Sequence, residues 1–240
     1  MRAGGDVTLT AKRIDMMGDS QLVAGSDAQG QLTRTGTLMM TSQGPLLEQG
    51  ANQATGALMV WGSEVDLAGS RTSGTDIMLS ANRGAITTNG AEMSGGKITA
   101  RAATFLSNNN GRLSANALKL MVHEISNRLG TLQQRGEHLL QLKVQQMNNH
   151  QGMVLNNGDT RIKAAWLENR AGRIIVPGAN LSLQTKILDN QEGTIKLLGS
   201  GKMTVVAERF NGYQGILWSA GAMTLAGEQL ELSQSVTRAQ

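Results

Sequence analysis

The stretch Leu188-Asp189-Asn190-Gln191-Glu192-Gly193-Thr194-Ile195 decides the fold, because its pattern returns at nearly constant spacing through the second half of the chain. Each copy has an apolar residue five positions before a glycine and another two positions after it. The glycines are Gly111, Gly130, Gly152, Gly172, Gly193 and Gly215, with spacings of 19, 22, 20, 21 and 22 residues. An asparagine stands three positions before the glycine in every copy but the last: Asn108, Asn127, Asn149, Asn169 and Asn190. A fixed period of this length indicates a repeat architecture.

A short segment of alternating apolar and polar residues follows each copy of this pattern, whose asparagine and glycine we call the marker asparagine and the marker glycine. Leu181 and Leu183 flank Ser182, for example, which is the pattern of a half-buried strand. The first half of the chain keeps a similar spacing without the asparagine, and glycine-rich turns replace it. Its apolar pairs are Leu38/Met40, Leu58/Val60, Ile77/Leu79 and Ile98/Ala100. The opening, from Val7 to about Leu32, fits no phase of the repeat.

A repeat of about 21 residues that contains β-strands is compatible with two architectures, leucine-rich repeats and a β-helix. Leucine-rich repeats would show denser leucine and a helical stretch in each repeat, and no sustained helical stripe of apolar residues is present. The sequence therefore predicts an all-β parallel β-helix, or solenoid, of about eleven coils of roughly 21 residues, on the order of 50 Å long. We expect less regular, glycine-rich repeats in residues 1–104 and asparagine-marked repeats in residues 105–240, within one continuous solenoid.

The composition suits a thin aliphatic core. Of 240 residues, 30 are glycine and only 6 are Phe, Tyr or Trp, while 40% are hydrophobic. Glycine is usually about 7% of a protein. The 2 prolines, Pro45 and Pro177, interrupt few ladder hydrogen bonds. The chain has no cysteine, which excludes disulfides and thiolate metal sites.

The repeated asparagines and glycines predict a structural corner. We expect the asparagines to stack as a ladder whose amides bond one to the next. We expect the coil corners to need a positive φ, which favours glycine and asparagine, and we expect these glycines to be the corner residues. A residue that recurs in every coil serves the architecture, whereas an active site occurs once.

Side chains that could carry chemistry show no clustering in the sequence. The histidines, His123, His138 and His150, lack metal-ligand spacing, and no catalytic or phosphate-binding motif occurs. We therefore expect no catalytic residues, no metal and no cofactor. The net charge of +4 is spread along the chain, so we expect neither nucleic-acid binding nor membrane insertion. Trp61, Trp166, Trp218 and Tyr213 are packing or end-cap residues on one interpretation and sugar-stacking platforms on the other.

Residues 166–174 and 188–195 resemble the haemagglutinin repeats of filamentous haemagglutinin-like exoproteins. Residues 14–18 and 65–70 are similar to the other repeat type of that family, which includes adhesins, haemolysins and contact-dependent growth inhibition exoproteins. The resemblance implies a right-handed β-helical shaft that is secreted to the cell surface through an outer-membrane partner. The chain shows no apolar signal segment, no Asn-Pro secretion motif and no toxin domain, so we expect a part of a longer exoprotein.

Three functions follow from these patterns. The first is a non-enzymatic shaft segment of a surface adhesin, which contacts a host-cell or bacterial receptor or glycan. The second is the stalk of a growth inhibition exoprotein that presents a toxin to neighbouring bacteria. The third is a β-helical enzyme acting on polysaccharides, although Asp15, Asp66, Asp76 and Asp189 are scattered. Uncapped strand edges also predict end-to-end self-association of the isolated segment.

Overall fold

The computed structural model describes residues 1–27, 29–32 and 35–240. Its contacts divide the chain into unit 1, Met1–Val122, and unit 2, His123–Gln240. Within the described ranges both units consist of strands joined by turns, without a helix. Asn108, the first marker asparagine, lies in unit 1. The change of repeat type expected at residues 104/105 stays a prediction.

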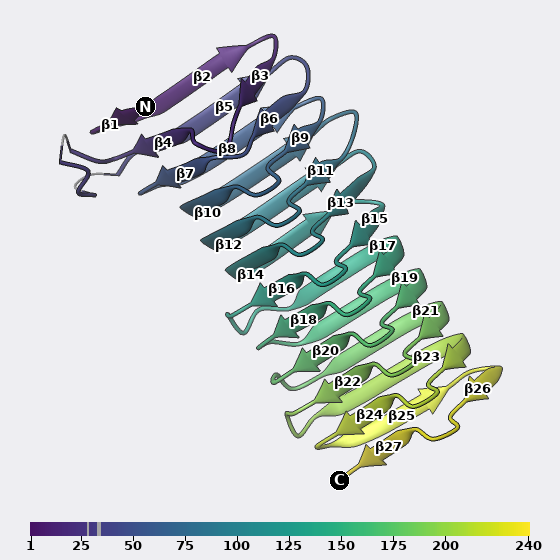
Figure 1. Cartoon of the computed structure of the whole chain (residues 1–240). Helices are drawn as coiled ribbons and strands as arrows, with labels where there is room; N and C mark the ends of the chain where they lie inside the picture. Colours follow the sequence, from purple (N-terminus) through teal and green to yellow (C-terminus); the bar gives the residue numbers. More distant parts are fainter. Residues whose placement is uncertain (28, 33–34) are drawn as a thin grey trace. The chain divides into compact units, whose positions relative to one another are not determined.

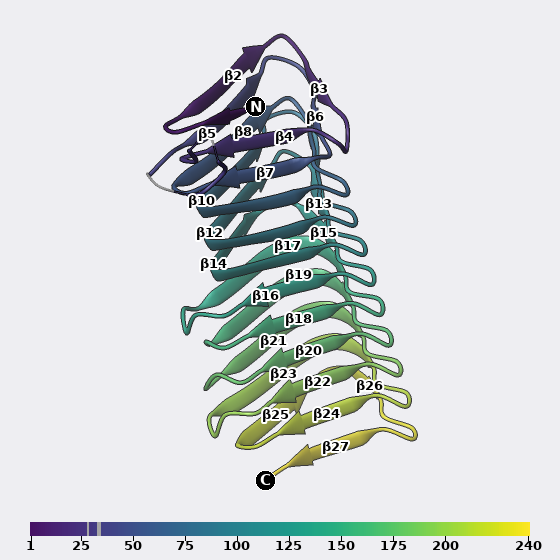
Figure 2. The same cartoon turned by 60° about the vertical axis from the view of Figure 1, so that its left-hand side comes forward.

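Unit 1 is built from two parallel sheets. Its strands are β1 (Arg2–Ala3), β2 (Val7–Ala11), β3 (Ile14–Met16), β4 (Gln21–Ala24), β5 (Leu38–Ser42), β6 (Leu46–Glu48), β7 (Ala51–Ala54), β8 (Ala57–Gly62), β9 (Val65–Asp66), β10 (Arg71–Ala81), β11 (Ile86–Thr87), β12 (Glu92–Ala102), β13 (Phe105–Ser107) and β14 (Arg112–Met121). One sheet runs β1-β4-β7-β10-β12-β14, with β2, β5 and β8 joined to it, and the other runs β3-β6-β9-β11-β13. Figure 2 shows β10, β12 and β14 side by side.

Unit 2 repeats the arrangement with different strand lengths. Its strands are β15 (Glu124–Ser126), β16 (Thr131–Gln134), β17 (Leu140–Asn148), β18 (Met153–Asn156), β19 (Thr160–Glu168), β20 (Arg173–Val176), β21 (Leu181–Asp189), β22 (Thr194–Leu197), β23 (Lys202–Asn211), β24 (Ile216–Ser219), β25 (Ala222–Ala226), β26 (Gln229–Glu231) and β27 (Val236–Ala239). One sheet runs β16-β18-β20-β22-β24-β27, and the other runs β15-β17-β19-β21-β23-β25, with β26 also paired to β23 (Figure 1). The long strands belong to the first sheet in unit 1 and to the second sheet in unit 2.

Within each unit the described strand pairs are parallel and join one turn to the next, so each core position forms a column. In unit 1 one buried column consists of Leu38, Leu58, Ile77, Ile98 and Leu118. In unit 2 a column in the other sheet consists of the buried Leu142, Ile162, Leu183 and Val205, followed by the half-buried Leu225. The predicted alternation and its spacing are confirmed. Within each unit the described residues are all β and form parallel stacked turns, about eleven in the two units together, with a spacing of about 21 residues, as the sequence predicts.

The first turn is longer than the others, which explains why its phase is hidden in the sequence. Val7 lies opposite Leu38, a separation of 38 − 7 = 31 residues. Leu38 lies opposite Leu58, a separation of only 20 residues. The additional residues fall between β4 and β5, so the strands on either side keep their register.

The corners of unit 2 are four-residue turns that begin at the marker asparagine and end at the marker glycine. The Gly152 N–H donates to the Asn149 carbonyl at 3.0 Å, and the Gly193 N–H donates to the Asn190 carbonyl at 2.9 Å. The left-handed residue of these turns stands directly before the glycine. The positive φ angles belong to Leu129, Gln151, Ala171, Glu192, Gln214 and, one turn later, Gln234, which precedes Ser235. Asn110 of unit 1 has the same conformation, and all these values lie between 50° and 56°.

The expectation that the corner glycines supply the positive φ is therefore wrong for Gly111, Gly152, Gly172, Gly193 and Gly215. Glycine is needed there for space. A Cβ built on Gly172 would collide with the Asn149 carbonyl oxygen of the neighbouring turn and lie 2.7 Å from Asn169 Oδ1. The stacking distance between successive corners, rather than the backbone conformation, excludes a side chain.

Substitution of the left-handed alanine tests this corner geometry. Ala171→Gly should stabilise the chain by about 1 kcal/mol, because a non-glycine residue in the left-handed region costs roughly that much. The matched change Ala165→Gly, within β19, should destabilise it by about 0.5–1 kcal/mol. Urea unfolding measures both, and effects of the same sign would contradict the assignment.

A second pair of variants tests the core column. Leu183 is fully buried, and Leu183→Ala should reduce the free energy of unfolding by about 2–5 kcal/mol, since a cavity remains among its neighbours. Gln184 is the next residue and is exposed, so Gln184→Ala should stay within about 0.5 kcal/mol. Similar losses for the two variants would show that the strand faces are assigned wrongly.

Candidate functional site

The marker asparagines of unit 2 lie in one buried row. Asn127 Nδ2 donates to Asn149 Oδ1, Asn149 Nδ2 to Asn169 Oδ1, and Asn169 Nδ2 to Asn190 Oδ1, each at 2.7 Å. Each amide also reaches backbone carbonyls, as Asn149 Nδ2 does at Gly152 and, in the next turn, at Arg173. These groups are out of contact with water, so each hydrogen bond avoids the cost of an unsatisfied buried amide.

The row ends where Gly212 replaces asparagine, and Phe210 provides the reason. Phe210 occupies the column of Leu188, where its larger ring is buried. A Cβ on Gly212 would lie 2.9 Å from two carbons of that ring. The aromatic side chain takes the room that an asparagine would need.

Unit 1 carries one marker asparagine, Asn108, which bonds to a threonine in the preceding turn. The Thr88 hydroxyl donates to Asn108 Oδ1 at 2.9 Å, and Asn108 Nδ2 donates to the Gly111 carbonyl at 3.2 Å. Both side chains are fully buried. The inside of the corner is therefore already polar at Thr88, in the turn that precedes the first marker asparagine.

A buried carboxylate in unit 1 escaped the sequence analysis. Glu48 is fully buried, accepts a hydrogen bond from Ser20 Oγ at 2.6 Å and another from the Gly50 N–H at 3.0 Å, and also accepts from Asn52 Nδ2. Ser70 and Thr72 continue the contacts from Asn52. Since every bond joins residues of neighbouring turns or of the same corner, this cluster ties the corner together.

A second polar row lies outside the ladder, one residue before each corner turn of unit 2 begins. Its members are Asn148, Glu168, Asp189, Asn211 and Glu231. Asn148 donates to Glu168 at 3.0 Å, and Asn211 donates to Asp189 at 3.1 Å. Asp189 Oδ1 also accepts the Gln191 N–H at 3.1 Å, which fixes the start of the corner.

Two members of this row are held in charged interactions. Arg170 pairs with Asp189 at 2.8 Å, and this hydrogen bond raises the pKa of Arg170. Hydrogen bonds from the side chain and backbone of Ser233 lower the pKa of Glu231, because they favour its ionised form. The row therefore presents fixed carboxylates on the surface of unit 2.

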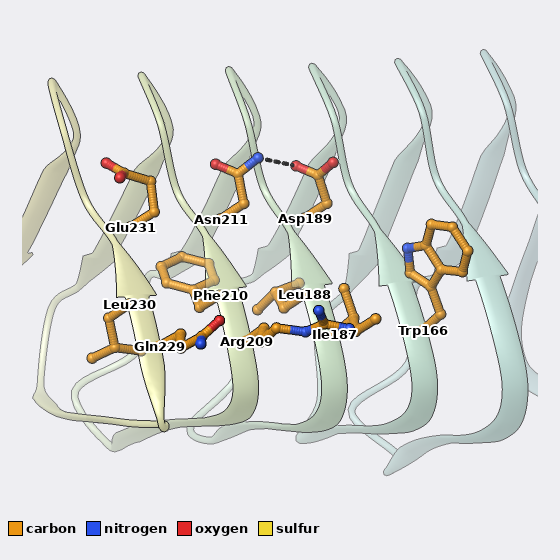
Figure 3. Close-up of a pocket in the computed structure, with 10 residues that line it drawn as sticks. All are labelled: Trp166, Ile187, Leu188, Asp189, Arg209, Phe210, Asn211, Gln229, Leu230 and Glu231. Carbon is orange, nitrogen blue, oxygen red and sulfur yellow. Dashed lines mark hydrogen bonds between the residues drawn. The ribbon is translucent and has the colours of Figure 1, made fainter.

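A groove of about 640 Å³ lies beside these carboxylates, over β19, β21, β23 and β26. Figure 3 shows Asp189, Asn211 and Glu231 along one side and Trp166, Ile187, Arg209 and Gln229 along the other. The second set occupies one register position in four successive turns. Trp166 is 45% exposed, which is unusual for so large an apolar side chain.

Of the aromatic residues considered as sugar platforms, the groove contains Trp166 alone. Trp218 and Tyr213 are half-buried and do not line it, and Trp61 is a half-buried residue of unit 1. Ile187, Arg209 and Gln229 were missed by sequence reasoning. These residues stand three positions before the residue that begins each corner turn, as Trp166 does before Asn169. Comparison of this position in successive repeats would have placed them in one row with Trp166.

The histidines lie apart from the groove. His123 and His138 are exposed, and His150 is half-buried at a corner, 4.0 Å from Glu168. Among residues 1–27, 29–32 and 35–240, no three His, Cys, Asp or Glu side chains are grouped so that they could hold a metal ion. The same part of the chain contains no helix with the length and apolar character required to cross a membrane.

Removal of one amide tests the ladder. Asn169→Ala should lower the free energy of unfolding by about 2–3 kcal/mol, because Asn149 and Asn190 lose their shared partner in a buried site. Asn157 is exposed and bonds to one carbonyl, that of Arg135, so Asn157→Ala should cost less than about 1 kcal/mol. Equal losses of stability for the two variants in thermal or urea unfolding would contradict a stabilising role of the ladder.

Comparison with known proteins agrees with this geometry. The family of the haemagglutinin repeat matches residues 2–46 and 49–227. The toxin CdiA of Yersinia pestis is 28% identical over 248 residues, an alignment that covers 98% of this chain and 7% of that protein. The chain thus spans a small fraction of the relative's length. No solved structure matches it. Since the family match extends over most of the sequence and the repeats form the stacked turns, the chain belongs to the haemagglutinin repeat family.

Proposed function

We propose that the chain is a non-enzymatic shaft segment of a large exoprotein, secreted to the bacterial surface, where it supports cell adhesion. The observation that carries this proposal is the repetition itself. Core columns, corners and the asparagine row recur from turn to turn, and each further turn adds about 4.8 Å along the stack. Such a structure extends whatever the longer protein carries.

The chemistry of the repeated side chains supports a mechanical role. The buried amides of the ladder bond to one another and to backbone carbonyls, which leaves them no capacity to act on a substrate. In the groove, Asp189 is held by Arg170 and Asn211, so it is a poor general base or acid. The proposal includes an outer-membrane secretion partner for the longer protein, as the family resemblance implies.

A second candidate is the stalk of a contact-dependent growth inhibition exoprotein, which would hold a toxin at a distance from the producing cell. The similarity to the toxin CdiA of Yersinia pestis favours it. The two candidates share the same shaft and differ in what the rest of the protein does.

Segment replacement in the producing bacterium tests the proposal. In-frame removal of the segment should reduce attachment of the cells to a surface. Replacement by haemagglutinin repeats with the same number of turns should restore most of it, because a shaft is specified by its length and fold. For the second candidate, the corresponding readout is killing of neighbouring bacteria in co-culture.

The outcomes separate the possibilities. Loss of killing with normal attachment would replace adhesion by toxin presentation. Unchanged attachment and unchanged killing would overturn the shaft proposal. Release of reducing ends when the purified chain is incubated with bacterial or plant polysaccharides would contradict the non-enzymatic assignment.

A further inference from the structure

We infer that the groove over β19, β21, β23 and β26 binds a neutral oligosaccharide. The inference deepens the proposed role in attachment and rests on it, since it names the chemical class that this part of the shaft would contact. It also gives a function to Trp166, which neither the core nor the corners use. The groove lies entirely within unit 2.

The apolar side of the groove is suited to a sugar ring. Trp166 is 45% exposed on β19, whereas Trp218, on β24 of the same unit, is half-buried. Ile187 lies directly beside Trp166 in the next turn (Figure 3). An indole face in this position offers a flat apolar surface to the C–H face of a pyranose, and its contact with water is the kind of exposure that a ligand removes.

The polar groups around Trp166 offer donors and acceptors in fixed positions. Arg209 and Gln229 continue the row in the next two turns, and in the described residues their side chains have no hydrogen-bond partner. Asp189 and Asn211, along the other side, are held by their mutual hydrogen bond of 3.1 Å. Free donors opposite preorganised acceptors match the hydroxyl groups of a sugar, which donate and accept at once.

The shape of the groove selects an extended ligand. Four successive turns at about 4.8 Å place its ends on the order of 14 Å apart. The site is a surface groove rather than an enclosed cavity, as Figure 3 shows, so it does not surround a compact cofactor. A short chain of linked sugar rings fits such a row of equivalent positions.

The charges favour a neutral sugar over an acidic one. Asp189 and Glu231 place two carboxylates along one side, and Ser233 lowers the pKa of Glu231. Arg170 is paired with Asp189 at 2.8 Å, and Arg209 supplies a second positive charge on the other side. The charges of the groove therefore balance, so a sulfated or carboxylated glycan gains no net attraction, whereas hydroxyl groups can bond to both sides.

Titration of the full 240-residue chain with neutral and acidic hexasaccharides tests the inference. Cellohexaose, maltohexaose and chitohexaose are the neutral probes, and a heparin hexasaccharide is the acidic one. Calorimetry and tryptophan fluorescence should detect at least one neutral hexasaccharide. Trp166→Ala should weaken its binding by about tenfold or more, as expected for an aromatic anchor. Arg209→Gln should weaken it as well, while Trp218→Phe, outside the groove, should leave it unchanged.

Several results of this titration would overturn the inference of a glycan site. Failure of all three neutral probes, or binding of the heparin hexasaccharide alone, overturns the inference. Equal binding by Trp166→Ala and the parent chain also overturns it, provided that circular dichroism shows both to be folded. Capture of a protein on the Trp166 face without any sugar would replace the glycan by a protein partner. These results leave the shaft proposal standing, since that proposal is tested by segment replacement in cells.

Discussion

The structure depends on the parallel hydrogen bonding of each turn to the next. A single turn of about 21 residues cannot bury its own apolar face, so its core and its backbone partners come from its neighbours. This requirement makes every turn copy the one before it. Leu183 has Ile162 on one side and Val205 on the other, and a shift of β21 by one residue would turn Leu183 out of this column toward solvent.

The corners follow from the same constraint. Successive turns approach closely at the corners. There the backbone carbonyl of the asparagine in one turn occupies the place of a side chain on the corner glycine of the following turn, as Asn149 does for Gly172. The asparagine side chains fill the space inside the corner and bond along the stack. The left-handed conformation then falls on the residue before the glycine, and Ala171 and Glu192 adopt it although it is unfavourable for them. Tight stacking therefore outweighs a local backbone cost.

Much of the fold could be predicted because a repeated constraint leaves a repeated signal. The spacing of Leu38, Leu58 and Ile77 gave the register of their strands, and the asparagine marker showed where the turns lie. The first turn could not be phased, since its additional residues between β4 and β5 interrupt the period. The expectation that Gly172 is needed for a positive φ was wrong, because a sequence does not distinguish a glycine with a positive φ from a glycine that has no space for a side chain. The partners of Glu48 occur once, and single contacts between turns leave no periodic trace. The row from Trp166 to Arg209 keeps a periodic position, but its residue types differ from turn to turn, so no residue pattern marks it.

Cysteine cross-linking tests the parallel register most directly, and the natural absence of cysteine makes the experiment clean. Ser182 lies opposite Thr204 on adjacent strands, and Thr224 lies one turn further on. The double variant Ser182→Cys/Thr204→Cys should form a disulfide within the chain under mild oxidation, because neighbouring strands are about 4.8 Å apart. The variant Ser182→Cys/Thr224→Cys, across two turns, should remain reduced. Cross-linking of the second pair, or failure of the first in a folded chain, would contradict the stacked parallel turns.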